Sequence, residues 1–412
     1  MRRFVTIIVP FFISFLAGAQ TISGPWKGEL QVGGTKLAIV FRFQDGGCTM
    51  DSPDQGAKDI PGELLFISAD SVSVSQKSMG MTFSGKLRDG AIVGRFSQRG
   101  LTVPLSLTPG EVVRNRPQTP LGPFPYMKEE VSFTNRDATM VGTLTYPEGW
   151  NGRKKVPVAI MVTGSGAQNR DEELFGHKPF LVIADYLARN GIATLRYDDR
   201  GAGETTGDAE NATTYDYMED AEAGLEFLRS KGKFKKVGVI GHSEGGSIAL
   251  MLGARKKVDF LVSLAGPGVQ GDSILLLQNL NALRKAGYPD MRLTKEFIRA
   301  QIKAQKNPWL DYFIDYDPLP DIKNVRCPAL ILNGDRDTQV DADVNFQTIV
   351  NNLPHNRSGK CFASKKTMAK RYPLLNHLFQ KCETGQAEEY SVIEETIDPE
   401  VLSDIARWIN KL

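Results

Sequence analysis

Hydrophobic and polar residues alternate along much of the first quarter of the chain, in short runs broken by glycine. Four segments carry this pattern: Leu37–Phe43, Ser71–Val74, Met81–Leu87 and Ala91–Phe96. A period of two is typical of strands that bury one face, and glycine-containing turns join antiparallel neighbours. Residues 20–108 are therefore predicted to form a small all-β domain, either a sandwich or a barrel.

The pattern changes after residues 109–126, whose five prolines predict a stiff linker. Apolar runs such as Val156–Val162 then alternate with amphipathic stretches such as Thr214–Ser230. This alternation is typical of βαβ units and a mostly parallel sheet. The segments Val131–Phe133 and Met140–Tyr146 predict a hairpin that opens the sheet.

Residues 127–412 are accordingly predicted to be an α/β domain with helices on both faces of its sheet. The chain length of 412 residues agrees with two domains, because single cores rarely grow past about 250–300 residues. A mainly helical insertion with aromatic residues, including Trp309 and Phe313, occupies about 269–321. This insertion is either a cap that roofs a substrate pocket, ordinary core, or a dimer contact.

The N-terminus has the pattern of a signal peptide at 1–19. Two arginines follow Met1, an apolar core runs from Phe4 to Leu16, and small residues stand at Ala17 and Ala19. The apolar core is too short to span a bilayer stably, although an uncleaved anchor is the alternative. The protein is therefore expected to be exported, to a periplasm or the medium, with no membrane span after the signal is removed.

Charge and cysteine content limit the partners further. The net charge is +2 and no basic block carries interleaved aromatic residues, so nucleic acid is not an expected partner. Four cysteines in an exported chain permit disulfides, and Cys361 with Cys382 is the predicted pair because both flank one late segment. Cys48 and Cys327 are equally consistent with buried thiols.

The most informative motif is Gly-His-Ser-Glu-Gly at Gly241–Gly245. It joins the apolar run Val237–Ile240 to a helical pattern that begins at Gly246. A sharp turn between strand and helix needs glycines beside its apex, because the two backbones approach closely there. Such a turn exposes the hydroxyl of Ser243 as a candidate nucleophile and leaves the backbone N–H of Glu244 as a donor to an oxyanion.

A serine hydroxyl needs a base, and the chain has four histidines, none four residues from another as metal ligands on a helix would be. His242 must point away from the adjacent serine and is interpreted as structural support. His177 opens a helix, and His355 lies in a polar turn. His377 is the predicted base, because in chains with this elbow the histidine comes last. No metal or cofactor is expected.

The acid that orients the base is expected on a turn after the preceding strand. The strand-like run Leu330–Leu332 is followed by two candidates, Asp335 and Asp337. Asp337 is the predicted acid, because Gly334 lets the chain turn and Val340 can anchor the return of the loop. Asp335 is the alternative, and its other interpretation is a turn residue that caps local N–H groups.

A second donor to the oxyanion is expected in the small-residue loop Thr163–Ala167, which follows the run Val158–Val162. Small residues let the backbone approach a substrate carbonyl. The N–H of Ser165 is the predicted donor, with Gly164 or Gly166 as neighbours. The other interpretation is a glycine-rich loop without a chemical role.

Together these motifs resemble the α/β-hydrolase fold, and more closely exported bacterial esterases of the serine-aminopeptidase-like branch that carry an N-terminal β domain. The motifs that carry the resemblance are Gly164–Gly166, Asn169–Glu172, Arg196–Gly203, Gly241–Gly245, Asp337 and Asn376–His377. The resemblance implies a Ser243–His377–Asp337 triad. One position departs from the family, because Thr163 stands where a histidine is common. Arg170–Asp171 and the segment Arg196–Gly203 are expected to form ion pairs and turns that brace the site.

The predicted activity is hydrolysis of small-molecule carboxylic (acyl) esters through an acyl-enzyme, without a cofactor. An alternative is a serine aminopeptidase or dipeptidyl peptidase, in which Asp311, Asp315 and Asp317 would supply carboxylates to bind the substrate amine. An alternative of another class is a catalytically inert protein that binds a glycan or cell-wall polymer.

Overall fold

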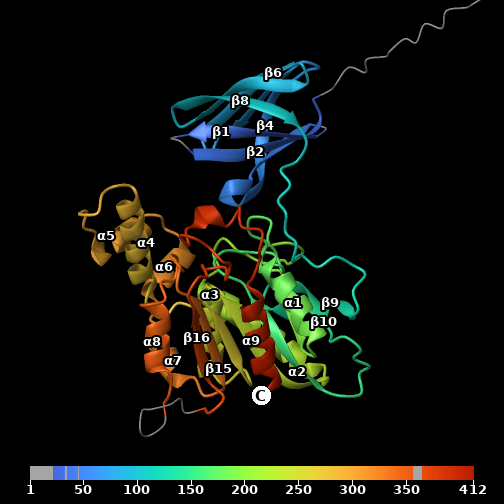
Figure 1. Cartoon of the computed structure of the whole chain (residues 1–412), viewed down its shortest axis with the longest axis vertical. Coiled ribbons are helices and arrows are strands. Elements are labelled where there is room, and N and C mark those ends of the chain that lie inside the picture. The colour runs from blue at the N-terminus through green and yellow to red at the C-terminus, as the bar shows by residue number, and fades with distance from the viewer. Residues whose placement is uncertain (1–21, 33–34, 45, 356–363) are drawn as a thin grey trace, which may run out of the picture. The chain divides into compact units, whose positions relative to one another are not determined.

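The computed structural model describes residues 22–32, 35–44, 46–355 and 364–412. The chain divides into two units, 1–113 and 114–412 (Figure 1). The predicted signal peptide at 1–19 lies outside the described residues. Within the described ranges, no helix is long and apolar enough to cross a membrane.

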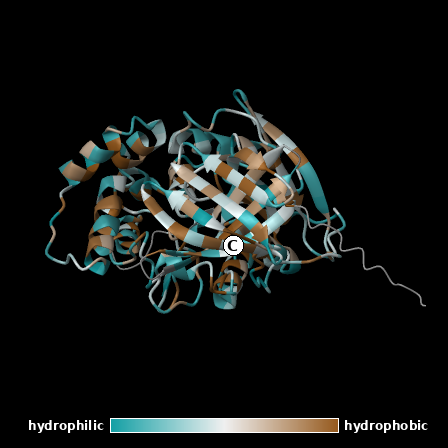
Figure 2. Ribbon diagram, turned by 90° about the horizontal axis from the view of Figure 1, so that it is seen from above, coloured by the Kyte–Doolittle hydropathy of each residue, from teal (hydrophilic) through white to brown (hydrophobic). Residues whose placement is uncertain are grey.

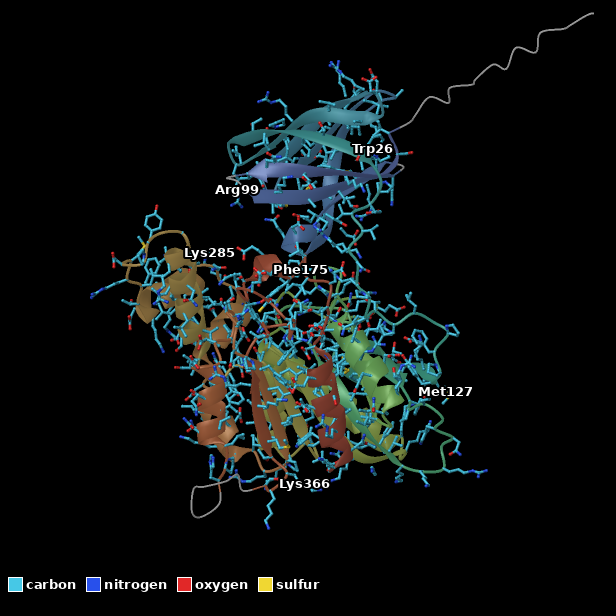
Figure 3. The ribbon with its side chains drawn as sticks, viewed as in Figure 1. Trp26, Arg99, Met127, Phe175, Lys285 and Lys366 are labelled. Atoms are coloured by element: carbon cyan, nitrogen blue, oxygen red, sulfur yellow. The ribbon has the colours of Figure 1, made fainter. Side chains whose placement is uncertain are left out.

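The first unit is a closed barrel of eight strands in which every pair of neighbours is antiparallel. The strands are β1 (Gly24–Val32), β2 (Thr35–Gln44), β3 (Gly47–Ser52), β4 (Ala57–Ile67), β5 (Ser71–Gln76), β6 (Met81–Arg88), β7 (Ala91–Gln98) and β8 (Leu101–Pro109), with a short helical turn, η1 (Pro53–Gln55), before β4. Hydropathy alternates along the strands (Figure 2), and the apolar positions fill the barrel around the buried Trp26 (Figure 3). Of the two predicted all-β forms, the barrel is correct.

The second unit is built on one eight-stranded sheet with the order β16-β15-β14-β13-β11-β12-β10-β9. Its strands are β9 (Lys128–Asn135), β10 (Ala138–Thr145), β11 (Val156–Val162), β12 (Ala193–Tyr197), β13 (Phe234–His242), β14 (Leu261–Leu264), β15 (Ala329–Gly334) and β16 (Met368–Tyr372). β10 is antiparallel to both of its neighbours, and the remaining pairs are parallel. The predicted opening hairpin is therefore confirmed.

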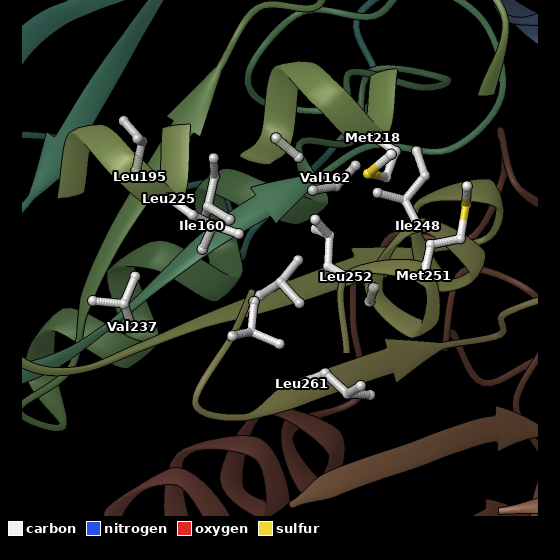
Figure 4. Packing of buried hydrophobic residues seen from close by; sticks show 14 of the residues in the cluster. Ile160, Val162, Leu195, Met218, Leu225, Val237, Ile248, Met251, Leu252 and Leu261 are labelled. Atoms are coloured by element: carbon white, nitrogen blue, oxygen red, sulfur yellow. The ribbon is translucent and has the colours of Figure 1, made fainter. Parts of the chain in front are cut away.

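Helices cover both faces of this sheet (Figure 1). They are α1 (Pro179–Arg189), α2 (Thr214–Ser230), α3 (Glu244–Ala254), α4 (Gly271–Lys285), α5 (Lys295–Lys303), α6 (Pro308–Asp315), α7 (Leu319–Asn324), α8 (Asn345–Asn352) and α9 (Pro399–Asn410), with a second short turn, η2 (Ala387–Glu389). α1 and α9 pack on one face, and α2, α3, α7 and α8 pack on the other. Figure 4 shows residues of the second of these layers, in which Leu225 of α2 and Leu252 of α3 belong to one buried cluster with Ile160 and Val237 of the central strands.

The predicted insertion at about 269–321 corresponds to α4–α7. Its helices are held by charged pairs, since Asp272 at the start of α4 accepts a hydrogen bond from Arg299 of α5 at 3.1 Å. Of the predicted Cys361–Cys382 pair, Cys382 is a free thiol, and Cys361 lies outside the described residues. Cys48 and Cys327 are also free thiols.

Candidate active site

Ser243 lies at the sharp turn between β13 and α3. Its backbone has φ 53° and ψ −118°, a conformation that a residue with a side chain rarely adopts. A Cβ on Gly241 would lie 1.8 Å from the carbonyl oxygen of Gly245, and a Cβ on Gly245 would lie 2.1 Å from the carbonyl oxygen of Val162. Both glycines are therefore required, and the strained turn presents the serine side chain at the carboxyl ends of the central strands.

His377 and Asp337 meet in a buried hydrogen bond. The loops after β16 and β15 bring His377 Nδ1 to 2.8 Å from Asp337 Oδ2. The other carboxylate oxygen of Asp337 accepts the backbone N–H groups of Gln339 at 2.9 Å and Val340 at 2.8 Å. Because the carboxylate only accepts, Nδ1 of His377 carries the hydrogen and Nε2 is left with a lone pair that can take a proton.

His242, the residue before Ser243 in the elbow, contacts His377. Nε2 of His242 lies 3.0 Å from the carbonyl oxygen of His377, and the two ring centroids are 4.8 Å apart. In the described part of the chain, no hydrogen bond joins the Ser243 hydroxyl to His377; such contacts are often long before substrate binds. Ser243, His377 and Asp337 thus come from three loops at one edge of the sheet.

The other candidates for base and acid lie elsewhere. Asp335 pairs with Arg371 and its side chain is about one-third exposed. His177 is fully buried between Thr396, 2.9 Å from Nδ1, and the carbonyl of Tyr390, 3.0 Å from Nε2. Burial lowers the pKa of His177 to about 4, so this ring is neutral and structural. Neither residue contacts the elbow.

The loop after β11 offers one N–H fewer than the sequence suggests. The Gly164 N–H donates to Oε1 of Glu172 at 2.8 Å, so Gly164 is not available as a donor to substrate. Ser165 lines the same cavity as Ser243 and Glu244. Within the described ranges, neither the N–H of Ser165 nor that of Glu244 donates a hydrogen bond, and the N–H of Glu244 opens a helix, where intrahelical partners are absent.

Thr163, the position that departs from the family pattern, connects this loop to Asp199 through its hydroxyl. Its hydroxyl donates to Asp199 Oδ2 at 2.6 Å, and the N–H of Gln168 donates to the same oxygen at 2.9 Å. Burial raises the pKa of Asp199 to about 8, against the effect of these two donors. The hydroxyl–carboxyl pair therefore connects the loop after β11 to the loop after β12.

The expected ion pairs that brace the site are present. Arg170 Nη2 lies 2.7 Å from Asp198 Oδ2, and Arg196 pairs with Asp171. Arg200, near the start of the loop after β12, makes two hydrogen bonds of 2.7 Å to Asp220 of α2. These pairs fix the loops after β11 and β12 against each other and against α2.

A cavity of about 160 Å³ opens beside Ser243. Its lining residues are Ser165, Ser243, Glu244, Pro267, Ile274, Leu275, Gln278, Trp309, Phe313, Gln339 and Val340. Five of these come from α4 and α6, so the insertion forms one wall of the cavity, as expected for a cap. The walls are mostly apolar, and among the described lining residues Glu244 is the only carboxyl.

The Glu244 side chain connects the elbow to this cap. Its Oε1 accepts hydrogen bonds from Thr214 Oγ1 at 2.6 Å and from Trp309 Nε1 at 2.8 Å, and the ring of Trp309 stacks on Phe313. Burial raises the pKa of Glu244. The residue after the nucleophile thus has a second role that the sequence motif did not reveal, because the motif concerns only its backbone.

Several proteins are similar to this chain. A family model described as serine aminopeptidase, S33, matches residues 179–319. Esterase EstD of Thermotoga maritima is 26% identical over 294 residues, which are 68% of each chain. The Pyrococcus furiosus esterase Pf2001 is 17% identical, with a TM-score of 0.48, over 73% of this chain and 98% of its own. Est1E from Butyrivibrio proteoclasticus with bound ferulic acid is 14% identical, with a TM-score of 0.44, over 68% of this chain and 96% of its own.

The second unit has the α/β-hydrolase fold. This fold is defined by a mostly parallel sheet with one antiparallel strand beside its edge, helices on both faces and a serine elbow after the fifth strand. The family model matches residues 179–319 of this unit. The predicted fold class, an α/β-hydrolase with a small helical cap preceded by an all-β domain, is confirmed.

Proposed function

We propose that this protein is a serine esterase that hydrolyses small carboxylic esters through an acyl-enzyme. The observation that carries the proposal is the buried His377–Asp337 hydrogen bond beside the strained elbow of Ser243, at an apolar cavity. The sequence similarity to Esterase EstD supports ester rather than amide bonds as the substrate.

In the proposed mechanism, His377 Nε2 takes the proton of Ser243 as the hydroxyl attacks the ester carbonyl. Asp337 holds the ring in the required tautomer and stabilises the imidazolium that forms. The N–H groups of Glu244 and Ser165 stabilise the oxyanion, each by about a hundred- to a thousandfold in rate. His377 then protonates the leaving alcohol, and water activated by the same ring hydrolyses the acyl-enzyme.

The size of the cavity limits the acyl group. A cavity of about 160 Å³ is close to the volume that accommodates benzene, about 150 Å³, in a protein interior. The acyl chain that fits is therefore about six carbons or shorter. No group of three or more His, Cys, Asp or Glu side chains suited to a metal occurs in the described part of the chain, and the proposed mechanism uses only side-chain and backbone groups.

The carboxylates predicted for the aminopeptidase alternative lie outside the cavity. Asp311 and Asp315 pair with Lys303 of the cap at 3.3 and 2.9 Å, and Asp317 accepts the N–H of Leu319. None of the three lines the cavity. Glu244 does line it, but burial favours its neutral form, which binds an ammonium weakly.

Two experiments test this proposal. p-Nitrophenyl esters with acyl chains of two to twelve carbons should give the highest kcat/KM at about four to six carbons, whereas aminoacyl-aminocoumarin substrates should give no turnover above background. A fluorophosphonate probe should label the wild-type protein and not Ser243→Ala. Preferred turnover of the aminocoumarin substrates would support the peptidase, and absence of labelling would support an inert binding protein.

A further inference from the structure

A buried carboxylate, Glu172, lies behind the candidate active site without touching the cavity. It is 3% exposed, and its backbone has a positive φ of 52°. Its Oε1 accepts the N–H of Gly164 at 2.8 Å and faces His242 Nδ1 at 2.9 Å. One oxygen atom therefore holds both the oxyanion loop and the residue that precedes the nucleophile.

His242 continues the connection to the general base. Its Nε2 lies 3.0 Å from the carbonyl oxygen of His377. A carbonyl oxygen can only accept, so Nε2 carries a hydrogen. Nδ1 faces an oxygen that already accepts the Gly164 N–H, which is the arrangement expected of an ionised carboxylate with two donors. With Glu172 ionised, both ring nitrogens of His242 are donors and the ring is an imidazolium.

The electrostatics of the site agree with this assignment. Burial opposes a charge on His242, but the Glu172 carboxylate, the hydrogen bond to the carbonyl of His377 and the charge of Asp337 together raise the pKa of His242. Glu172 Oε2 has no hydrogen-bond partner in the described part of the chain. The two bonds to Oε1 are thus the contacts that compensate the buried charge of Glu172, and the loss of His242 would remove one of them.

We propose that Glu172 and His242 are positioning residues that set the oxyanion loop and the general base together. Glu172 fixes the Gly164 peptide, and this orients the next N–H, that of Ser165, toward the cavity. The His242 ring, held by Glu172, fixes the carbonyl of His377 and with it the height of the imidazole above Ser243. This inference rests on the proposed esterase function and explains why the histidine of the elbow motif has a role without taking part in proton transfer.

Kinetics test the inference through a variant that keeps the shape of the side chain. In Glu172→Gln the amide oxygen can still accept the Gly164 N–H, but the charge that holds His242 as an imidazolium is gone. A displacement of reacting groups by about 1 Å can cost about a hundredfold, so kcat should fall about 10- to 100-fold while KM changes less than threefold. Glu173→Gln is the matched control, because Glu173 is a neighbouring carboxylate that pairs with Lys178, and it should keep wild-type kinetics.

A second pair of variants separates positioning from simple loss of structure. His242→Gln retains an N–H that can reach the carbonyl of His377, whereas His242→Ala retains none. The glutamine variant should therefore recover at least tenfold of the kcat that alanine loses, with equal melting temperatures. Equal kcat in the two variants would overturn the inference.

The ionisation of His242 can be observed directly in the wild type. Because the chain has four histidines, selective ¹⁵N labelling of the imidazoles gives few signals, and the His242 signals are those lost in His242→Gln. Both of its ring nitrogens should be protonated at pH 7.5. A single protonated nitrogen would overturn the inference, as would Glu172→Gln with kcat within twofold of a wild type that hydrolyses esters. A wild type without ester turnover would instead refute the proposed function.

Discussion

Replacement of Asp337 by asparagine tests the proposed acid at constant side-chain shape. Asp337 Oδ1 accepts two backbone N–H groups, and Oδ2 accepts His377 Nδ1 and Asn333 Nδ2, the latter at 3.2 Å. An asparagine must place its NH₂ at one of these oxygen positions. If the NH₂ faced the backbone N–H groups of Gln339 and Val340, both would lose their acceptor. The amide oxygen therefore stays at the Oδ1 position, and the NH₂ faces His377.

This orientation forces the wrong tautomer on the base. His377 Nδ1 must then accept, and the ring hydrogen moves to Nε2, where it blocks removal of the Ser243 proton. The same change in a serine protease lowers kcat by about 10⁴, which corresponds to about 5.5 kcal/mol of activation free energy. We expect a loss of this size in Asp337→Asn. The NH₂ group also faces Asn333, and this contact should lower the free energy of unfolding by about 1–3 kcal/mol.

The assay is kcat on p-nitrophenyl butyrate, with circular dichroism to verify the fold. Asp335→Asn is the control, because Asp335 forms a partly exposed ion pair with Arg371 and such pairs contribute about 0–1 kcal/mol. The control should keep kcat within twofold of the wild type. The reasoning is refuted if Asp337→Asn stays within tenfold of the wild type, or if Asp335→Asn loses as much activity.

Three further predictions concern stability and substrate size. Asp220→Ala removes the closer of the two ion-pair partners of the buried Arg200 guanidinium, the other being Asp137 at 4.0 Å, so chemical denaturation should show a free energy of unfolding lower by about 3–5 kcal/mol; a loss below 1 kcal/mol would contradict this. Burial raises the pKa of Asp199 from 3.8 to about 8. Between about pH 4 and pH 8 the native state therefore keeps a proton on Asp199 that the unfolded chain has lost. Because of this group, the free energy of unfolding falls as pH rises through that window. Asp199→Asn removes this pH dependence. As pH rises through the window, the free energy of unfolding of the variant relative to the wild type should increase by up to about 1.4 kcal/mol per pH unit, measured by urea unfolding at pH 5 and pH 8. A constant difference would show that the raised pKa is wrong. Trp309→Ala removes a cavity wall and the hydrogen bond to Glu244, so the ester with the highest kcat/KM should be about two or more carbons longer than for the wild type, and an unchanged optimum would show that the cap does not limit the acyl chain.

The central strands and helices could be predicted from the sequence because their patterns are strong. Val156–Val162 and Thr214–Ser230 coincide with β11 and α2. β16 was not predicted, since Met368–Tyr372 is a short edge strand in which polar residues interrupt the apolar ones. α8 was missed as well: it has eight residues, and the residue before it, Val344, offers no side-chain cap.

The site could be predicted only as far as local motifs reach. The glycines of the elbow predict a turn, because their spacing reflects a steric requirement within five residues. The choice between Asp335 and Asp337 depends on which carboxylate faces a loop some 40 residues later, and sequence favours one without placing either. Glu172 ends the motif Asn169–Glu172 that carries the family resemblance, but nothing local indicates which groups its side chain contacts. It stands among other charged residues, and its role arises from contacts with Gly164 and His242, the latter 70 positions away.

The central claim is that Ser243 carries the acyl group during turnover, and trapping that intermediate tests it most directly. Wild-type protein mixed with excess p-nitrophenyl butyrate and quenched in acid within milliseconds should gain the mass of one butyryl group, located by peptide mass spectrometry at Ser243. Ser243→Ala should show no adduct and no turnover above background. A butyryl group found on another residue, or a Ser243→Ala variant that hydrolyses the ester at the wild-type rate, would contradict the account.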